Sequence, residues 1–445
     1  MPRFEHTEGS SSTYWEIKRE GSVLITRSGP IGTDGQEQIQ TLRTDFDARQ
    51  DYQKQVREKT RAGFTRVKPK DTAPAPLSNP EFEEAILRDP KSEDGYLAYA
   101  EWLKGQGDPR GELITLQHAQ LRAQVDEALH LKRKVTALQK QHEGTLLGVG
   151  LTSMQDAKAL VTGWQLGFIH SARIMAPDND ADADFNSVET LTMLLRHPSG
   201  RFLRDLTLGI PSLTFHANYA DLIKVLTQWA PRTLTRLFIG DFEHPDESEL
   251  SRVYLGDLEN LLKALPQLTS LRLRGTNVRL GTLELPELRR FVLESAGMSM
   301  ATVQSIASAN WPKLEHLELG FGGEDYSGPV QGKDLQPILD ATGLPKLIHL
   351  GLCDADFSDQ LVPLLATSKL LKQLKSLDLS KGTLTDDDAE AMLDNASAFK
   401  HLKRLDVTQN RLTKKGVKRV TRVCPNVAAG NQRKDDDDRY STVGE

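Results

Sequence analysis

The 445-residue chain lacks the features that mark a secreted, membrane-spanning or disulfide-rich protein. It has only two cysteines, Cys353 and Cys424, which excludes a disulfide framework and any cysteine-rich zinc module. No apolar run approaches the ~20 residues of a membrane-spanning helix, and the first residues show no secretory signal. We therefore expect a protein of the reducing cytoplasm that has no membrane partner.

Sequence motifs of catalysis are also missing. The chain contains no phosphate-binding Gly-x-x-x-x-Gly-Lys-Ser/Thr loop, no His-Glu-x-x-His pair and no Gly-x-Ser-x-Gly turn. Neither cysteine has a histidine partner that would activate it as a nucleophile. We therefore predict a protein that is not an enzyme and that has no catalytic residue and no cofactor.

Charge is nearly balanced over the whole chain but differs along it. The 56 Lys and Arg against 62 Asp and Glu give a net charge of −6, which argues against a chain-wide nucleic-acid or anionic-membrane surface. Residues 1–70 carry +3, residues 71–165 carry −4 and residues 166–445 carry −5, which sum to −6. Only the first segment is therefore a candidate for a phosphate-rich partner.

Residues 1–70 predict a small domain that contains strands and one helix. Apolar and polar residues alternate from Tyr14 to Lys18, and a Glu-Gly turn separates them from a second strand at 22–26. Apolar residues then recur at every fourth position after Asp45, as one face of a helix requires. A closing strand at 64–67 ends the domain, and residues 71–79, with two prolines, form a linker.

This segment resembles the WGR domain. The matching residues are Tyr14-Trp15-Glu16-Ile17, Ile31-Gly32-Thr33-Asp34-Gly35-Gln36, Phe46, Ala48, Tyr52, Lys59-Thr60 and Gly63-Phe64. Where the family has Trp-Gly-Arg, however, this chain has Ser28-Gly29-Pro30. WGR domains of poly(ADP-ribose) polymerases use that Trp and Arg at a DNA break and at a domain interface. Ser and Pro can neither stack on a base nor clamp a phosphate, so the resemblance implies the fold and weak nucleic-acid contact at most.

The basic residues of this segment are the candidates for such contact. They are Arg27, Arg49, Lys54, Arg57, Lys59 and Arg61. The alternative is that they form the solvated face of a helix, which is the usual place for charged helix residues. We favour this alternative.

Residues 80–160 predict a helical region. Asn79 and Pro80 are typical of a helix start, and Asp89-Pro90 ends that helix. Further helices are expected at 92–103 and, as one long helix, at 112–141. Asp108 is expected to cap the long helix through its backbone N–H groups.

Part of this region, residues 80–117, resembles the bacterial repeat-companion domain. The motifs that carry the resemblance are Ala85-Ile-Leu-Arg-Asp-Pro90, Tyr99-Ala-Glu-Trp-Leu103 and Gly107-Asp-Pro-Arg-Gly-Glu-Leu-Ile114. The resemblance implies no activity, but such domains commonly lie beside repeat arrays. Because terminal repeats expose apolar edges, we expect residues 80–160 to cap the array that follows.

Residues 161–430 repeat the pattern Leu-x-x-Leu-x-Leu. A degenerate first strand is expected at 164–169, and eight units begin at Leu203, Leu234, Leu268, Leu288, Leu314, Leu347, Leu374 and Leu402. One unit cannot bury its apolar face alone, so neighbouring units stack into a continuous core. The array resembles the ribonuclease-inhibitor-like type, an α/β leucine-rich-repeat solenoid with strands on the concave side and helices on the convex side. Residues 431–445, which include a run of four Asp, are expected to be a disordered tail.

Strand residues between the leucines point away from the core and form the expected binding face. The candidate protein-binding residues are Arg236, Phe238, Arg272, Arg274, Arg290, Glu294, His316, Glu318, His349, Asp378, Arg404 and Asp406. Basic residues gather in units two to four and acidic residues in units five to eight. This distribution favours a protein ligand of complementary charge.

Four residues of this face are of the types that bind zinc. His316, Glu318, His349 and Cys353 lie on two neighbouring strands at reachable spacing. Such residues also scatter by chance on repeat surfaces, and the intervening glycines provide no buttress. We therefore predict a polar binding surface without a metal.

The sequence favours a non-enzymatic cytoplasmic scaffold or adaptor that binds a protein of unknown identity on its repeats. The combination of segments resembles bacterial proteins. The alternative is a nucleic-acid-linked regulator, in which the WGR-like segment contacts DNA or RNA and the repeats recruit a partner. A third reading, an enzyme regulator that acts through the repeats, differs only in its partner.

Overall fold

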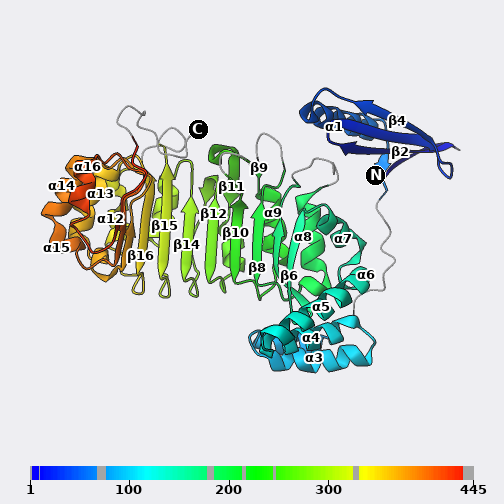
Figure 1. The fold of residues 1–445 in the computed structure, drawn as a ribbon, viewed down its shortest axis with the longest axis horizontal. Coiled ribbons are helices and arrows are strands. Elements are labelled where there is room, and N and C mark those ends of the chain that lie inside the picture. Colours follow the sequence, from blue (N-terminus) through cyan, green and yellow to red (C-terminus); the bar gives the residue numbers. More distant parts are fainter. Residues whose placement is uncertain are drawn as a thin grey trace. The chain divides into compact units, whose positions relative to one another are not determined.

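The computed structural model describes residues 3–9, 11–67, 77–177, 185–212, 217–243, 247–323 and 330–433 (Figure 1). The chain divides into two compact units. Residues 1–168 and 174–199 form the first unit, and residues 169–173 and 200–445 form the second. Among the described residues, no helix is both long enough and apolar enough to cross a membrane.

The N-terminal domain of the first unit is an antiparallel sheet packed against one helix. The sheet has the order β4-β3-β2-β1-β5, with β1 Arg3–Glu8, β2 Ser11–Glu20, β3 Val23–Pro30, β4 Gln36–Thr41 and β5 Thr65–Arg66. Helix α1, Asp45–Arg61, begins at its N-cap Thr44. Trp15, Ile17 and Tyr52 lie in the core between sheet and helix. The predicted hairpin and helix are confirmed, whereas β1 and β4 were not predicted.

The helical region contains six helices, whereas the sequence pattern predicts three. Its elements are α2 Pro80–Arg88, α3 Glu93–Gly105, α4 Pro109–Arg122, α5 Val125–Gln141, α6 Glu143–Leu146 and α7 Gly148–Asp156. The long helix predicted at 112–141 is wrong, because Ala123 is extended (ψ 151°) and separates α4 from α5. The break lets Leu113 of α4 and Val135 of α5 share one core with Leu146.

Two caps predicted in this region are confirmed. The Asn79 side chain accepts a hydrogen bond from the N–H of Glu81, and the Asp108 side chain accepts one from the N–H of Arg110. Asp108 also forms a buried ion pair with the Arg110 guanidinium at 2.6 Å. The charged turn around Asp108 therefore has a structural role.

The degenerate strand predicted at 164–169 is two strands. They are β6 Leu160–Gln165 and β7 Phe168–Ile174. Leu166 and Gly167 separate them, and both residues have positive φ values, 47° and 79°. A two-residue turn therefore falls where the pattern predicted a continuous strand. Helix α8, Ser187–Arg196, follows in the first unit.

The second unit is built on one large sheet whose strands follow the chain order (Figure 1). After β7, its strands are β8 Asp205–Gly209, β10 Arg236–Asp241, β12 Ser270–Arg274, β14 Arg290–Glu294, β15 His316–Gly322, β16 His349–Ala355, β17 Ser376–Asp378, β18 Arg404–Asp406 and β19 Val427–Ala428. All neighbours from β8 to β19 pair in parallel. Each predicted repeat supplies one strand, and the leucines between the outward residues are almost completely buried.

Helices and short strands connect the strands of the large sheet. The helices are α9 Ala220–Trp229, α10 Glu259–Ala264, α11 Met300–Ala307, α12 Gln336–Leu339, α13 Ser358–Thr367, α14 Asp386–Asp394, α15 Ala396–Phe399 and α16 Lys414–Val420, and the 3-10 turns are η1 Pro198–Gly200, η2 Leu250–Arg252, η4 Gly332–Leu335 and η5 Leu370–Gln373. A second parallel sheet, β9-β11-β13, consists of Ala217–Asn218, Val253–Asp257 and Thr276–Arg279 and was not predicted. The shortest repeat, between β12 and β14, holds β13 and no helix, as its length requires.

The last repeat extends to the end of the described chain. Asn410, completely buried, donates from its side chain to the carbonyls of Leu379 and Val407 and accepts from the N–H of Leu384. The backbone N–H of Arg433 donates to the carbonyl of Asn410 at 2.7 Å. Residues 431–433 therefore belong to the last repeat rather than to a tail, and residues 434–445 lie outside the described residues.

Candidate functional site

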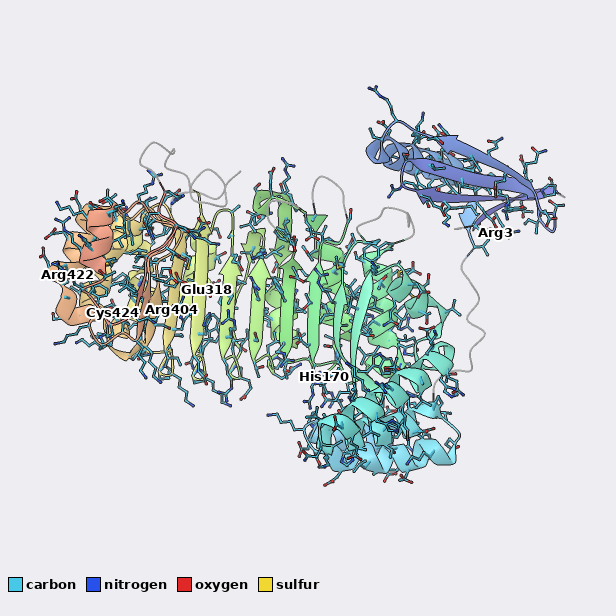
Figure 2. All side chains as sticks on the ribbon, viewed as in Figure 1. Arg3, His170, Glu318, Arg404, Arg422 and Cys424 are labelled. Carbon is cyan, nitrogen blue, oxygen red and sulfur yellow. The ribbon has the colours of Figure 1, made fainter. Side chains whose placement is uncertain are left out.

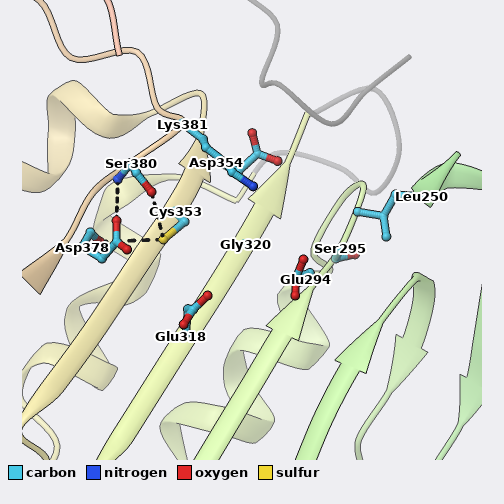
Figure 3. A pocket seen from close by; sticks show the side chains of 10 residues that line it. All are labelled: Leu250, Glu294, Ser295, Glu318, Gly320, Cys353, Asp354, Asp378, Ser380 and Lys381. Atoms are coloured by element: carbon cyan, nitrogen blue, oxygen red, sulfur yellow. Dashed lines mark hydrogen bonds between the residues drawn. The ribbon is translucent and has the colours of Figure 1, made fainter. Parts of the chain in front are cut away.

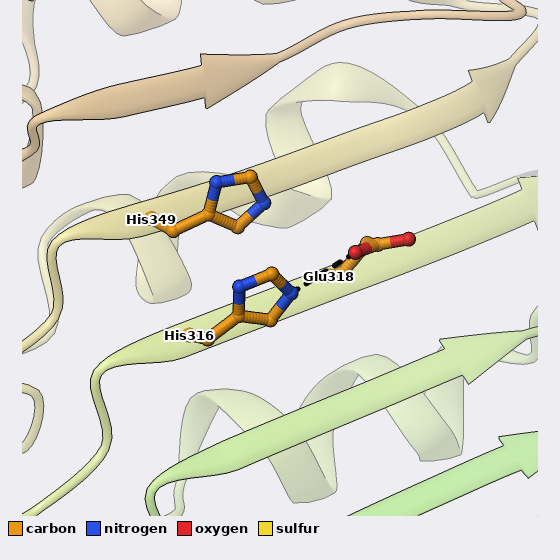
Figure 4. A group of neighbouring side chains, drawn as sticks. All are labelled: His316, Glu318 and His349. Atoms are coloured by element: carbon orange, nitrogen blue, oxygen red, sulfur yellow. Dashed lines mark hydrogen bonds and ion pairs between the residues drawn. The ribbon is translucent and has the colours of Figure 1, made fainter. Parts of the chain in front are cut away.

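The candidate site is the face of the large sheet that carries the outward strand residues, here called the open face (Figure 2). Parallel pairing aligns Arg236, Ser270, Arg290, His316, His349, Ser376 and Arg404 in one row across successive strands. The residues two positions further along each strand form the next row. The close-up views show helices behind the strands, on the side opposite the labelled side chains (Figures 3 and 4).

Three predicted residues, Arg272, Arg274 and Glu294, form a compact ion cluster on β12 and β14. One Glu294 oxygen accepts from Arg272 Nη2 and the other from Arg274 Nη2, both at 2.7 Å. Burial by itself would raise the pKa of Glu294, but the two guanidinium groups outweigh it and hold this pKa below its usual value. The cluster therefore keeps one net positive charge, and its carboxylate joins the two arginines.

Phe238 provides the aromatic surface beside this cluster. The Arg272 guanidinium carbon lies 4.4 Å from the centroid of the Phe238 ring, within the range of a cation–π contact. Arg236, on the same strand as Phe238, forms an ion pair with Asp205 at 2.9 Å while its side chain stays 53% exposed. This half of the open face, on β8 to β14, is called the arginine half.

The two predicted histidines stack on one another (Figure 4). The ring centroids of His316 and His349 lie 4.0 Å apart at an interplanar angle of 9°. His316 Nε2 lies 3.0 Å from a carboxylate oxygen of Glu318, and that oxygen also lies 3.8 Å from Arg290 Nη2. The hydrogen bond with His316 is the largest cause that lowers the pKa of Glu318.

His349 lies between His316 and Ser376 on neighbouring strands. Its Nδ1 lies 2.7 Å from Ser376 Oγ, whereas its Nε2 is buried and has no hydrogen-bond partner among the described residues. Burial, with a further contribution from His316, lowers the pKa of His349 to about 4. The His349 ring is therefore neutral at physiological pH.

A pocket of about 230 Å³ lies on the open face and is lined in part by Glu318, the partner of His316 (Figure 3). Its lining includes Glu294, Glu318, Cys353, Asp378 and Ser380. Burial raises the pKa of the Cys353 thiol well above its ordinary value, which disfavours the reactive thiolate. Burial also raises the pKa of Asp378, which accepts a hydrogen bond from the N–H of Ser380. The half of the open face on β15 to β18 is called the histidine half.

The last predicted pair of the open face lies on β18. Arg404 Nη2 and a carboxylate oxygen of Asp406 are 3.0 Å apart, and the Arg404 side chain is 60% exposed. The expected separation of basic and acidic repeats is therefore only partial, because acidic side chains already compensate several arginines. Of the residues that line the pocket, Leu250, Ser295, Asp354 and Lys381 were not predicted, because they lie outside the Leu-x-x-Leu-x-Leu pattern.

The nucleic-acid candidates are placed on β3 and α1 of the N-terminal domain. Arg27 forms an ion pair with Glu37 at 2.7 Å, and Lys59 Nζ lies 4.9 Å from the centroid of the Phe64 ring. Lys54, Arg57 and Arg61 are exposed on α1. Arg49 lies in the same helix, and its side chain is outside the described part of the chain. The role of these residues stays a prediction.

Comparisons with known protein families match two parts of the chain. The model of the WGR domain matches residues 2–71, and the model of a leucine-rich repeat matches residues 372–393 and 400–420. The chain thus contains a WGR domain at its N-terminus and leucine-rich repeats. No curated protein matches it.

Comparisons with solved structures add the fold. A crystal structure of a protein from Bacteroides fragilis is 20% identical, covers 97% of both chains and has a TM-score of 0.53, so a bacterial protein has a similar architecture. An internalin from Listeria monocytogenes is 15% identical over 59% of this chain and 88% of its own, with a TM-score of 0.25, which is too low to support an argument.

Proposed function

We propose that the open face binds a protein partner and that the chain is a non-enzymatic scaffold or adaptor in the cytoplasm. In this proposal the repeats form a solenoid, with the strands on its concave side and the helices on its convex side. The observation that carries the proposal is the alignment of polar side chains across successive parallel strands at one register. Such rows form a broad surface, which suits a macromolecular ligand better than a small one.

The exposed charges of the open face support a partner that carries charged groups of both signs, because each exposed arginine of the row lies beside a carboxylate. Arg236, Arg290 and Arg404 lie in one row, and their side chains are 53%, 47% and 60% exposed. Arginine and aromatic residues are enriched where proteins bind one another, and Phe238 beneath Arg272 supplies the aromatic part. Leucine-rich repeats elsewhere serve protein interaction, which agrees with this use of the face.

The absence of enzymatic activity remains part of the proposal. The Cys353 thiol, the most nucleophilic type of side chain on the open face, is buried and has a raised pKa. This favours a structural thiol over a catalytic one.

The alternative proposal is a nucleic-acid-linked regulator, and the WGR domain match at residues 2–71 favours it. Against it, Ser28 and Pro30 replace the Trp and Arg of the family motif, and Arg27 is compensated by Glu37. Contacts from the remaining exposed charges would be non-specific, with dissociation constants of roughly 10⁻⁴ to 10⁻⁶ M.

One pair of variants tests the protein-binding proposal. Affinity capture with mass spectrometry identifies proteins held by the tagged full-length chain, and each is then titrated in pure form against two variants. The first variant, Arg236→Glu with Arg290→Glu, reverses two charges on the open face. The second variant, Lys372→Glu with Lys400→Glu, makes the same change in net charge at exposed residues outside the strands. We expect the first variant to bind at least about tenfold more weakly and the second to bind like the wild type. Equal affinity of the partner for the wild type and both variants would show that the open face is not the binding site.

A fluorescence-anisotropy titration with nicked, blunt and single-stranded oligonucleotides at about 150 mM salt tests the alternative. Weak binding to all three supports the scaffold proposal. Nanomolar binding to one end structure, abolished by reversal of Arg49, Lys54 and Arg57, would support the regulator instead.

A further inference from the structure

We propose that His316, His349 and Glu318 form a binding site for Zn²⁺ on the histidine half of the open face. Each residue offers one ligand atom, and these atoms all lie within 4.8 Å of one another. The proposed site differs from the metal-free surface that the sequence predicts. The structure shows the distances between the three side chains, which the spacing of residues in the sequence does not give.

The strand register brings the three side chains together. His316 and His349 are direct partners in the parallel pair β15–β16, and Glu318 follows His316 by two residues, on the same face. The partner of Glu318 on β16 is Gly351, and a Cβ there would lie 2.8 Å from Glu318 Cγ. Glycine at 351 therefore leaves the space that the Glu318 side chain occupies.

The ligand chemistry of this group suits zinc. Imidazole nitrogen and carboxylate oxygen bind Zn²⁺ at about 2.0–2.2 Å, so neighbouring ligands of one tetrahedral ion lie about 3.3 Å apart. The present separations, up to 4.8 Å, exceed that value, and the stacked rings, only 9° from parallel, must tilt toward each other before both histidines can bind one ion. Three protein ligands leave a fourth position for water, as in zinc sites that are open to solvent.

The unpartnered nitrogen of His349 is the second observation that points to a ligand. Its Nε2 is buried without a hydrogen-bond partner, although a buried polar atom of this kind is normally satisfied. Ser376 Oγ, 2.7 Å from Nδ1, can accept a hydrogen bond from Nδ1–H, and in this tautomer the Nε2 lone pair is free for a metal.

Two neighbours limit the ligand set and the affinity. Cys353 accepts a hydrogen bond from Ser380, donates to the carbonyl of Asp378 and lies outside the group of ligand atoms, so we exclude it from the ligands. Arg290, 3.8 Å from the Glu318 carboxylate, opposes a cation, so the affinity is expected to be moderate. Arg290→Gln should therefore bind Zn²⁺ more tightly than the wild type.

The test is calorimetric titration of Zn²⁺ into the full-length protein after dialysis against a chelator. We expect one ion per chain and at least a tenfold loss of affinity in His349→Gln and in Glu318→Gln. Ser376→Ala, which removes the partner of Nδ1, should bind about tenfold more weakly. His170→Gln, on β7 of the same sheet and outside the group, is the matched control and should bind like the wild type.

Binding of Co²⁺ tests the site in the wild-type protein, so this test does not require any variant to fold. Co²⁺ added to the wild-type protein should give visible ligand-field absorption typical of a four-coordinate site, and Zn²⁺ should abolish it. Circular dichroism melts establish that each variant is folded. Absence of stoichiometric Zn²⁺ binding, or equal affinity in His349→Gln, Glu318→Gln and His170→Gln, would overturn the proposal.

Discussion

The two halves of the open face differ in how their buried ionisable groups are paired. In the arginine half, Glu294 is held between Arg272 and Arg274, and their attraction lowers its pKa despite burial. In the histidine half, Asp378 makes no ion pair within the described residues, and burial raises its pKa. His349 likewise keeps an unpartnered nitrogen there. The first half is thus organised by its own contacts, whereas the second half retains polar groups that a ligand can satisfy.

Removal of the core beneath the histidine half should have the largest effect. Leu377→Asp places a carboxylate at a position that is 1% exposed between Leu350 and Leu405, and we expect a loss of more than about 4 kcal/mol in unfolding free energy. Urea unfolding followed by circular dichroism measures this loss. Lys375→Asp, at an exposed neighbouring position, is the control and should unfold like the wild type. An unchanged transition for Leu377→Asp would contradict the stacked-repeat core.

Neutralisation of Glu294 should destabilise the arginine half. Glu294→Gln leaves Arg272 and Arg274 close together without the carboxylate that joins them, and we expect a loss of about 1–2 kcal/mol, since all three side chains are partly exposed. Asp205→Asn breaks the more exposed pair with Arg236 and should cost at most about 0.5 kcal/mol. Equal effects of the two substitutions in urea unfolding would refute the special role of Glu294.

The histidine half should respond to acid through His349. Its pKa is lowered to about 4 in the folded protein, against about 6.5 for an ordinary histidine, so between these pH values only the unfolded chain takes up the proton. Stability is therefore lost as the pH falls from about 6.5 to about 4. Glu318 opposes this shift, while His316, Arg290 and Arg404 add to it.

We expect the wild type to lose about 1–2 kcal/mol more than His349→Gln between pH 7 and pH 4, after allowance for partial exposure. Denaturant unfolding over this pH range provides the measurement. Parallel pH profiles for the two proteins would show that His349 titrates like an ordinary histidine.

Asp378→Asn should have the smallest effect and the opposite sign to Glu294→Gln. Because burial raises the pKa of Asp378, the ionised form is disfavoured in the folded state, and stability is lost as the pH rises through the folded pKa. Asparagine removes this penalty and can still accept from the N–H of Ser380, so a gain of about 0.5 kcal/mol is expected at pH 7. The gain should vanish below the ordinary pKa of Asp, and a loss of stability at pH 7 would contradict the comparison.

The repeat pattern predicts the strands of the open face and their relative register. Buried leucines at fixed spacing define which residues point outward, so the neighbours Arg290, His316 and His349 could be placed in one row from the sequence. The pattern does not predict which outward side chains pair, because that depends on rotamers and on contacts between strands about 20 residues or more apart. The pairing of Glu294 with two arginines and the unpartnered Nε2 of His349 are of this kind.

Outside the repeats, the predicted elements differ from the structure where the local sequence contains no helix-breaking residue. No Pro or Gly marks the break at Ala123, and the break depends on the packing of α5 against α4. The sheet β9-β11-β13 was missed because its strands have two to five residues and lie in connections where helices are usual. The capping of the array by residues 80–160 stays a prediction.

The hydrogen bonds of the last repeat limit where the chain can be truncated or labelled without loss of contacts. Gln432 accepts from the N–H of Leu412 and donates to the carbonyl of Val407, so a protein that stops at residue 430 would leave both groups to water. Loss of Arg433 would remove the N–H that reaches Asn410. For surface immobilisation or a fluorescent label, the attachment point therefore belongs after residue 433, where it leaves these hydrogen bonds intact.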